Sequence, residues 1–138
     1  MDIRDFNKTI IDEFRANGGK VGGQFAGAPL LLLTTTGAKS GAARLNPLVY
    51  LADGDRCVII ASNAGAPANP PWYHNLIAHP DVEVEVGAQR FKARAEVVNE
   101  PERSKLYEKM VSVMPVFADY ARKTSRVIPV IALQRRPA

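Results

Sequence analysis

The stretch DVEVEVGAQRFKARA, from Asp81 to Ala95, decides the fold of this chain. Apolar and charged residues alternate on both sides of Gly87, which is the pattern of two half-buried strands. A two-residue turn at Gly87 and Ala88 suits type II′, which takes glycine at its first central position. The resulting cross-strand pairs are Glu85–Arg90, Glu83–Lys92, Asp81–Arg94 and Val84–Phe91. A shift by one residue would break every pair, so the sequence predicts an antiparallel hairpin in this register.

Three strands are predicted before this hairpin and one after it. The first is continuously apolar, so we expect it to be buried on both faces. The four segments are Leu30–Thr36, Leu45–Leu51, Cys57–Ala61 and Val127–Leu133. Pro129 marks the last of them as an edge or bulged strand, because proline cannot donate to the ladder. Short turns join successive strands, so the pattern predicts a mainly β, α+β fold whose roughly six antiparallel strands curl into a small barrel.

An amphipathic helix is predicted at the N-terminus, within residues 1–19. Its apolar stripe repeats at spacings of three and four residues: Ile3, Phe6, Ile10 and Phe14. Gly18 and Gly19 supply its stop, because glycine tolerates the left-handed cap. We expect the stripe to pack on the barrel. A weak peripheral contact with a membrane surface is the alternative.

Shorter helices are predicted farther along the chain. Trp72–Ala78 is long enough for one. Another is expected to begin with Asn99 as N-cap and Glu102 reaching back to it. Pro115 should interrupt that helix and leave a second short helix after it. The residues expected to face inward are Leu106, Met110, Val113 and Phe117.

Length and composition fit one domain over residues 1–138, with neither a transmembrane helix nor a secretory signal. The 138 residues include 18 Lys and Arg against 14 Asp and Glu, for a net charge of +4. No acid occurs between Phe14 and Ala52. Such asymmetry favours an anionic partner; surface charge that only keeps the protein in solution is the alternative. Cys57 is the only cysteine, so no intrachain disulfide can form, and a cytoplasmic location is expected.

The chain lacks the usual signatures of catalysis by side chains. It has no dinucleotide-binding glycine motif, and Ala38-Lys39-Ser40 lacks the upstream glycines of a P-loop. The only histidines, His74 and His79, have no cysteine or paired carboxylates close by in the sequence, so no metal site is expected. If the protein is an enzyme, the few titratable groups in its candidate site mean that it must take its reactivity from a cofactor.

The segment Thr34–Leu48 is a candidate anion site. Its turn has glycine at both ends, which allows backbone N–H groups to converge. Lys39, Ser40 and Arg44 can add side-chain donors, so a phosphate is a suitable ligand. An ordinary surface hairpin is the alternative interpretation.

A second candidate lies in two neighbouring segments, Ala61–Gly65 and Asn69–Leu76. Small residues at a strand end leave room for a flat ring, and Trp72 and Tyr73 can wall it. The amides of Asn63 and Asn75 can pair with carbonyl and imide groups at the edge of such a ring. The alternative is that the two aromatic residues only cap the barrel.

Taken in order, these motifs resemble the deazaflavin-dependent nitroreductase family, from about Phe6 to Leu133. Five motifs carry the resemblance: Thr34–Gly41, Arg44–Leu48, Ala61–Gly65, Asn69–Leu76 and Thr124–Val130. Members are small oxidoreductases with a split β-barrel of the FMN-binding-like type. They use coenzyme F420, a 5-deazaflavin with a phosphate and an oligoglutamate tail. The resemblance implies one split-barrel, deazaflavin-binding domain over residues 1–138.

The same resemblance implies a role for particular residues. The phosphate and the start of the tail would be held by Lys39, Ser40 and Arg44. The deazaflavin would be lined by Asn46, Pro47 and Leu48. The ring edge and ribityl chain would meet Ser62, Asn63, Ala64 and Gly65, and that side would be closed by Trp72, Tyr73 and Asn75. The hydride acceptor would contact Val49, Met114, Phe117 and Tyr120, with Tyr120 as the catalytic residue.

The implied activity is hydride transfer from reduced F420 to a quinone-like, enone or nitro acceptor. Only Tyr120 among the late-helix positions keeps a hydroxyl, which favours a quinone-like or other conjugated acceptor over a nitro compound. Two alternatives stay open: FMN in the same barrel, and a non-enzymatic deazaflavin carrier. A barrel that binds single-stranded nucleic acid is disfavoured, because Trp72 is the only tryptophan. The oligomeric state is left open.

Overall fold

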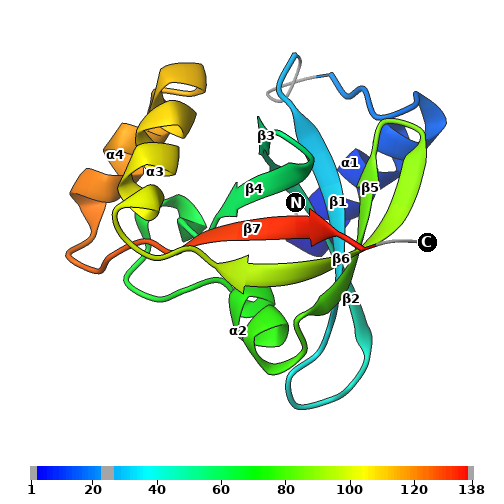
Figure 1. The fold of residues 1–138 in the computed structure, drawn as a ribbon. Helices are drawn as coiled ribbons and strands as arrows, with labels where there is room; N and C mark the ends of the chain where they lie inside the picture. The colour runs from blue at the N-terminus through cyan, green and yellow to red at the C-terminus, as the bar shows by residue number, and fades with distance from the viewer. Residues whose placement is uncertain (1–2, 23–26, 137–138) are drawn as a thin grey trace.

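A seven-stranded antiparallel sheet is the centre of the computed structural model, which describes residues 3–22 and 27–136, with backbone alone for residues 3–6 (Figure 1). The strands are β1 (Leu30–Thr36), β2 (Ala43–Val49), β3 (Leu51–Asp53), β4 (Arg56–Ile60), β5 (Asp81–Val86), β6 (Gln89–Val97) and β7 (Val130–Arg135). They lie in the order β2-β1-β5-β6-β7-β4-β3. The expected antiparallel, mainly β architecture is thereby confirmed.

The sheet curls back on itself because its two edge strands are consecutive in the chain. Tyr50 alone separates β2 from β3, and its N–H donates to the carbonyl of Pro29 at 3.0 Å. The predicted strand Leu45–Leu51 is therefore two strands, since the chain changes partner from β1 to β4 at this corner. If β2 and β3 are counted as one bent strand, the sheet has the six strands expected.

The register of the β5–β6 hairpin is the predicted one, with Val84 opposite Phe91 and Glu85 opposite Arg90. Two of the three predicted ion pairs, Glu85–Arg90 and Glu83–Lys92, are not formed among the described residues, whereas Asp81–Arg94 is. Glu85 accepts two hydrogen bonds from Arg15 of the N-terminal helix, at 3.1 and 2.8 Å, so Arg90 bonds Glu83 diagonally instead. The hairpin is thus bonded to the N-terminal helix as well as across its own two strands.

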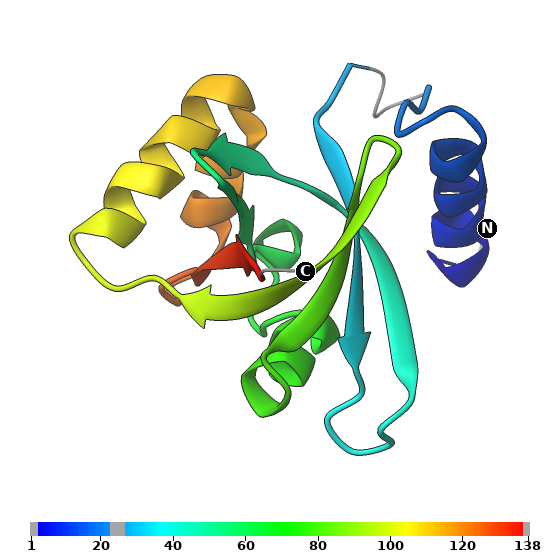
Figure 2. The ribbon, with the colours of Figure 1, turned by 45° about the vertical axis from the view of Figure 1, so that its right-hand side comes forward.

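That helix, α1 (Ile3–Ala16), packs on one flank of the barrel, while α3 (Glu102–Val113) and α4 (Val116–Lys123) cover the other (Figure 2). Ile10 and Phe14 are buried against Leu30 and Leu32 of β1, which confirms packing on the barrel for this half of the stripe. The side chains of Ile3 and Phe6 lie outside the described residues. None of the described helices is long and apolar enough to cross a bilayer.

The late helices differ from the prediction at their start. Asn99 contributes only its backbone carbonyl, which accepts from the N–H of Arg103 at 3.0 Å. The carboxylate of Glu100 accepts from the N–H and the hydroxyl of Ser104 instead, and these bonds lower the pKa of Glu100. Glu100 lies before the helix, and its side chain reaches forward over the first turn to Ser104, where it satisfies a backbone N–H that has no partner within the helix. Pro115 separates α3 from α4 as expected.

Two further expectations need correction. Val113 is 51% exposed, whereas Tyr107, six residues earlier in the same helix, is buried with Leu106 and Met110. The closing strand begins at Val130 rather than Val127, because Val127 lies in solvent and Pro129 has no N–H for the ladder. The predicted helix after the loop is α2 (Pro71–Ala78), which lies below the barrel in Figure 1.

Candidate functional site

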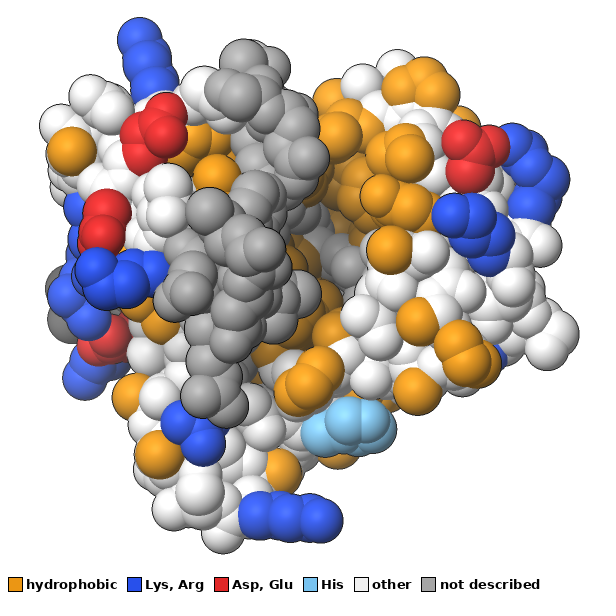
Figure 3. Space-filling view, turned by 180° about the vertical axis from the view of Figure 1, so that it is seen from behind, with side chains coloured by type: hydrophobic (Ala, Val, Ile, Leu, Met, Phe, Trp, Pro, Cys, Tyr) orange, Lys and Arg blue, Asp and Glu red, His pale blue; other side chains and the backbone are white. Residues whose placement is uncertain are grey.

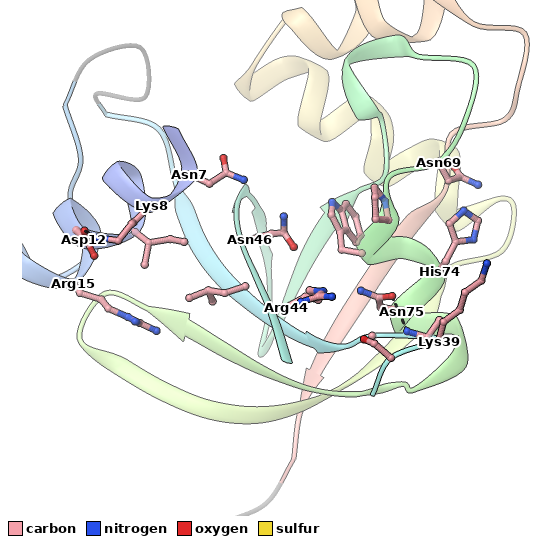
Figure 4. Close-up of a pocket in the computed structure, with 17 residues that line it drawn as sticks. Asn7, Lys8, Asp12, Arg15, Lys39, Arg44, Asn46, Asn69, His74 and Asn75 are labelled. Atoms are coloured by element: carbon pink, nitrogen blue, oxygen red, sulfur yellow. Dashed lines mark hydrogen bonds and ion pairs between the residues drawn. The ribbon is translucent and has the colours of Figure 1, made fainter. Parts of the chain in front are cut away.

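A cleft of about 1240 Å³ lies between α1, the loop joining β1 to β2, and α2 (Figure 4). Six of the predicted cofactor residues line it: Lys39, Ser40, Arg44, Asn46, Trp72 and Asn75. The structure therefore brings the candidate anion site and one wall of the candidate ring site to the same cavity. Lys8, Asp12 and Arg15 of α1 form the facing wall, which sequence reasoning did not include.

The β1–β2 loop is fixed by its own backbone. Gly37 donates to the carbonyl of Ala42 at 2.7 Å, and Gly41 donates to the carbonyl of Gly37 at 2.9 Å. The hydroxyl oxygen of Ser40 accepts from the N–H of Ala42 at 3.1 Å, which leaves the hydroxyl proton for a ligand. Gly41 has a φ of 71°, which few other residues adopt. The loop is a formed turn that presents Lys39 at its tip.

Asn75 ties this loop to α2. Its side-chain oxygen accepts from the N–H of Ala38 at 3.0 Å, and its side-chain nitrogen donates to the hydroxyl of Thr35 at 3.2 Å. Both Thr35 and Asn75 are buried. The amide expected at the edge of a ring thus has two protein partners already, although Asn75 still lines the cleft.

The charged side chains of the α1 wall are paired, whereas those of the facing wall are not paired among the described residues. On α1, Lys8 pairs with Asp12 at 3.1 Å, and Arg15 pairs with Glu85 at 2.8 Å. The hydrogen bonds from Arg15 lower the pKa of Glu85. Within the described part of the chain, neither Lys39 nor Arg44 has an ion pair or a hydrogen bond from its side chain, and both are exposed. An anion in this cleft would meet two uncompensated cations, so the donor set fits a phosphate or carboxylates.

The predicted ring-edge segment forms the 3-10 turn η2 (Asn63–Gly65), outside the cleft proper. Its residues have φ values of 47°, 54° and 82°, of which the first two are unusual for residues other than glycine. Gly65 lies so close to α4 that an added Cβ would stand 2.8 Å from Lys123 Cβ and 3.0 Å from the carbonyl oxygen of Tyr120. The turn is therefore strained and packs directly on α4.

The predicted acceptor residues gather in one apolar cluster beneath α3 and α4. It includes Val49, Met114, Phe117 and Tyr120. Phe117 is buried, and its ring meets that of Tyr120 edge to face, with ring centroids 5.4 Å apart. Met114 and Tyr120 are half-exposed at the margin. Figure 3 shows apolar side chains on this side of a hollow in the back face of the molecule.

Tyr107 fixes this cluster and was missed by sequence reasoning. Its hydroxyl donates to the carbonyl of Phe117 at 2.6 Å, and burial raises its pKa. The guanidinium of Arg103 lies over its ring, 5.3 Å from the centroid. The sequence did contain a signal for Tyr107. It is adjacent to Leu106, which was predicted to face inward, and it lies three residues before Met110, on the same side of the helix.

Three further predicted cofactor residues, Pro47, Leu48 and Tyr73, lie on or against the barrel, whereas Asn63 and Ala64 are exposed. Leu48 and Tyr73 contact the core cluster, and Pro47 lies opposite Leu32 in the β1–β2 pair. The side chain of Asn63 donates to the carbonyl of Ala68 at 3.0 Å. In the described residues, no group of three or more His, Cys, Asp or Glu could hold a metal ion.

Comparison with known proteins identifies the family. The chain matches the family described as F420H(2)-dependent quinone reductase over residues 7–135. A Mycobacterium tuberculosis protein named F420H(2)-dependent quinone reductase is 43% identical over 128 residues, which cover 89% of this chain and 85% of that protein. This chain therefore belongs to the F420H(2)-dependent quinone reductase family, which confirms the deazaflavin-dependent relationship expected from the motifs.

Solved structures agree on the fold. An F420-H2 dependent reductase, FDR-A, superposes with a TM-score of 0.72 at 36% identity, covering 77% of this chain and 94% of its own. A structure described as a domain-swapped dimer gives 0.73 at 33% identity, with 96% of each chain covered. The Vibrio cholerae heme storage protein HutZ, at 14% identity and a TM-score of 0.63, shares the fold alone. The split-barrel prediction is confirmed.

Proposed function

We propose that this protein is an F420H2-dependent reductase that transfers hydride to a quinone, within one deazaflavin-binding domain over residues 1–138. The observation that carries the proposal is a pair of cations without a side-chain partner among the described residues: Lys39 on a preformed loop and Arg44 near the start of β2, both lining the cleft. A ligand with a phosphate and several carboxylates suits such a wall. Family membership supports the same cofactor.

The chain's own residues divide the work of binding. Lys39, Ser40 and Arg44 would hold the phosphate and the first tail carboxylate, and Asn75 keeps the β1–β2 loop in place. The ring is bordered by Asn46, Pro47, Leu48, Ser62, Asn63, Ala64, Gly65, Trp72 and Tyr73. The reduced deazaflavin, when bound, supplies a hydride. These residues orient the ring and exclude water from it.

The acceptor is placed by the cluster below α3 and α4. Val49, Met114 and Phe117 offer an apolar surface that suits the flat ring of a quinone. The hydroxyl of Tyr120, at the margin of this cluster, donates a hydrogen bond to a quinone carbonyl oxygen and stabilises negative charge that develops there. A quinone reduced by hydride also needs a proton, which Tyr120 or solvent supplies.

Two experiments with purified protein test the proposal. Fluorescence titration with F420 and, separately, with FMN should show tighter binding of F420, because both Lys39 and Arg44 line the cleft and F420 brings carboxylates as well as a phosphate. Oxidation of F420H2 should then depend on menadione and on the protein. Tighter binding of FMN would favour the flavin alternative, and stoichiometric F420 binding without turnover of any quinone would favour a carrier.

We also propose that any membrane contact is peripheral and made through α1. Ile10 and Phe14 are taken up by the barrel, so the contact would fall on the first turns of the helix. Co-sedimentation with vesicles of anionic lipid, for the full chain and for a variant lacking residues 1–6, tests this. Equal sedimentation of the two would contradict it.

A further inference from the structure

Arg126 lies just after α4 and binds the segment that precedes α2. Its guanidinium donates four hydrogen bonds. The acceptors are the carbonyls of Ala61 (3.1 Å), Ser62 (2.7 Å) and Ala66 (3.0 Å) and the side-chain oxygen of Asn69 (2.7 Å). All four acceptors are neutral, so the positive charge is held by oriented dipoles instead of an acid.

The segment that Arg126 holds does not sit in a relaxed conformation. Asn63 and Ala64 occupy the left-handed region, which costs free energy for residues with a Cβ. Two backbone bonds close the turn, from Gly65 to Ser62 at 2.9 Å and from Ala66 to Asn63 at 3.0 Å. These two bonds and the bond from the Asn63 side chain to the carbonyl of Ala68 are all local, so contacts from outside the turn contribute to holding its strained conformation.

Arg126 is itself bonded to the C-cap residue of α4, the helix that carries Tyr120 and is called the acceptor helix below. Its backbone N–H donates to the hydroxyl of Thr124 at 3.2 Å, and Thr124 follows directly after α4. Gly65 meets the same helix at Tyr120 and Lys123. The ring-edge turn and the helix that carries Tyr120 are thus joined twice, once by packing and once through the guanidinium.

We infer that Arg126 is a positioning residue that sets the ring-edge turn against the acceptor helix, and so aligns the two halves of the site proposed above. This inference rests on the proposed function for its catalytic consequence, but not for its structural one. Lysine cannot replace this arginine, because one ammonium group cannot reach four acceptors spread over residues 61–69. Arg126→Lys should therefore release the turn while keeping the charge.

Hydrogen exchange of the cofactor-free protein tests the structural part. In Arg126→Lys, the amides of Gly65 and Ala66 should exchange about 10-fold faster or more, as expected when charge-assisted bonds are lost. The amides of β1 should not change. Arg122→Lys is the matched control, since Arg122 lies on α4, is largely exposed and pairs only with Asp119. Asn69→Ala, which removes one of the four bonds, should give a smaller acceleration at the same amides.

Kinetics of the loaded enzyme test the catalytic part. Arg126→Lys should lower kcat for quinone reduction by about 10-fold or more, with a smaller change in F420 affinity, because Lys39 and Arg44 still hold the phosphate. If the amides of Gly65 and Ala66 exchanged at the wild-type rate in Arg126→Lys, the positioning role of Arg126 would be overturned. Equally fast exchange of the β1 amides would overturn it too, because the effect would then not be confined to the turn. Absence of F420H2 oxidation by wild-type protein would instead overturn the proposed function, while the exchange result would stand.

Discussion

Removing either free cation of the cleft should weaken F420 binding without weakening the fold. Lys39 and Arg44 are exposed and have no side-chain partner among the described residues, so Lys39→Ala and Arg44→Ala leave no buried group unpaired. We expect the free energy of unfolding to change by less than about 0.5 kcal/mol in each variant. Each lost charge-assisted contact should cost about 1.5–3 kcal/mol of binding, which is about 10- to 150-fold in Kd.

The assay is a fluorescence titration of F420 at two salt concentrations. Between 0.1 M and 1 M salt the screening length falls from about 10 Å to about 3 Å, so the wild-type Kd should rise with salt and that of the double variant should rise less. Lys92→Ala is the matched control, because it also lowers the net charge from +4 but lies on β6, away from the cleft. Equal affinity of wild type, Lys39→Ala and Arg44→Ala at low salt would refute the assignment. An equal loss of F420 affinity in Lys92→Ala would show that the effect comes from net charge and not from contacts of Lys39 and Arg44.

Three further predictions address the rest of the site. Tyr120→Phe should lower turnover of menadione by about 10-fold or more while F420 affinity stays constant, and wild-type turnover would remove Tyr120 from catalysis. Asn75→Leu strips the partners from Ala38 and Thr35, so urea unfolding should show a loss of about 1–3 kcal/mol, and a loss near zero would show that the loop does not depend on this amide. Glu85 has a pKa lowered by Arg15, so its contribution is present above its ordinary value of 4.5 and is lost as pH falls through the lower folded value. Glu85→Gln should therefore flatten the fall of stability with acid, and a wild-type profile in this variant would contradict the role of the Arg15–Glu85 pair.

The elements that the sequence predicted well are those with strict alternation. In the hairpin of β5 and β6, every second side chain is apolar, and a register shift would have put Val84 into solvent and charges into the core. The bend at Tyr50 has no such signal. Leu48, Val49 and Leu51 are all apolar, and the change of partner from β1 to β4 follows from the curvature of the whole sheet.

In the candidate site too, the residues with a local sequence signal were predicted and those whose place depends on the tertiary fold were not. Lys39 and Arg44 could be predicted because one lies within a glycine-bounded turn and the other follows it, in a chain segment without acids. Glycine spacing says nothing about Arg15, whose place in the cleft depends on how α1 crosses the barrel. Nor could the sequence show that the side-chain amide of Asn75 bonds Ala38 and Thr35. In a single sequence, an asparagine that binds a ligand cannot be distinguished from one that holds a loop.

The roles that we propose for Arg44 and Arg126 are opposite, and the difference follows from their burial and their partners. Arg44 is exposed and without a side-chain partner in the described part of the chain, so its charge is available to a ligand. Arg126 is half-buried and donates four of its five N–H groups to protein oxygens, so little remains for a ligand. A cation that binds must stay unsatisfied until the ligand arrives, whereas a cation that positions must be satisfied beforehand. The same criterion assigns Arg15, bonded twice to Glu85, to the support of the cleft and not to its ligand.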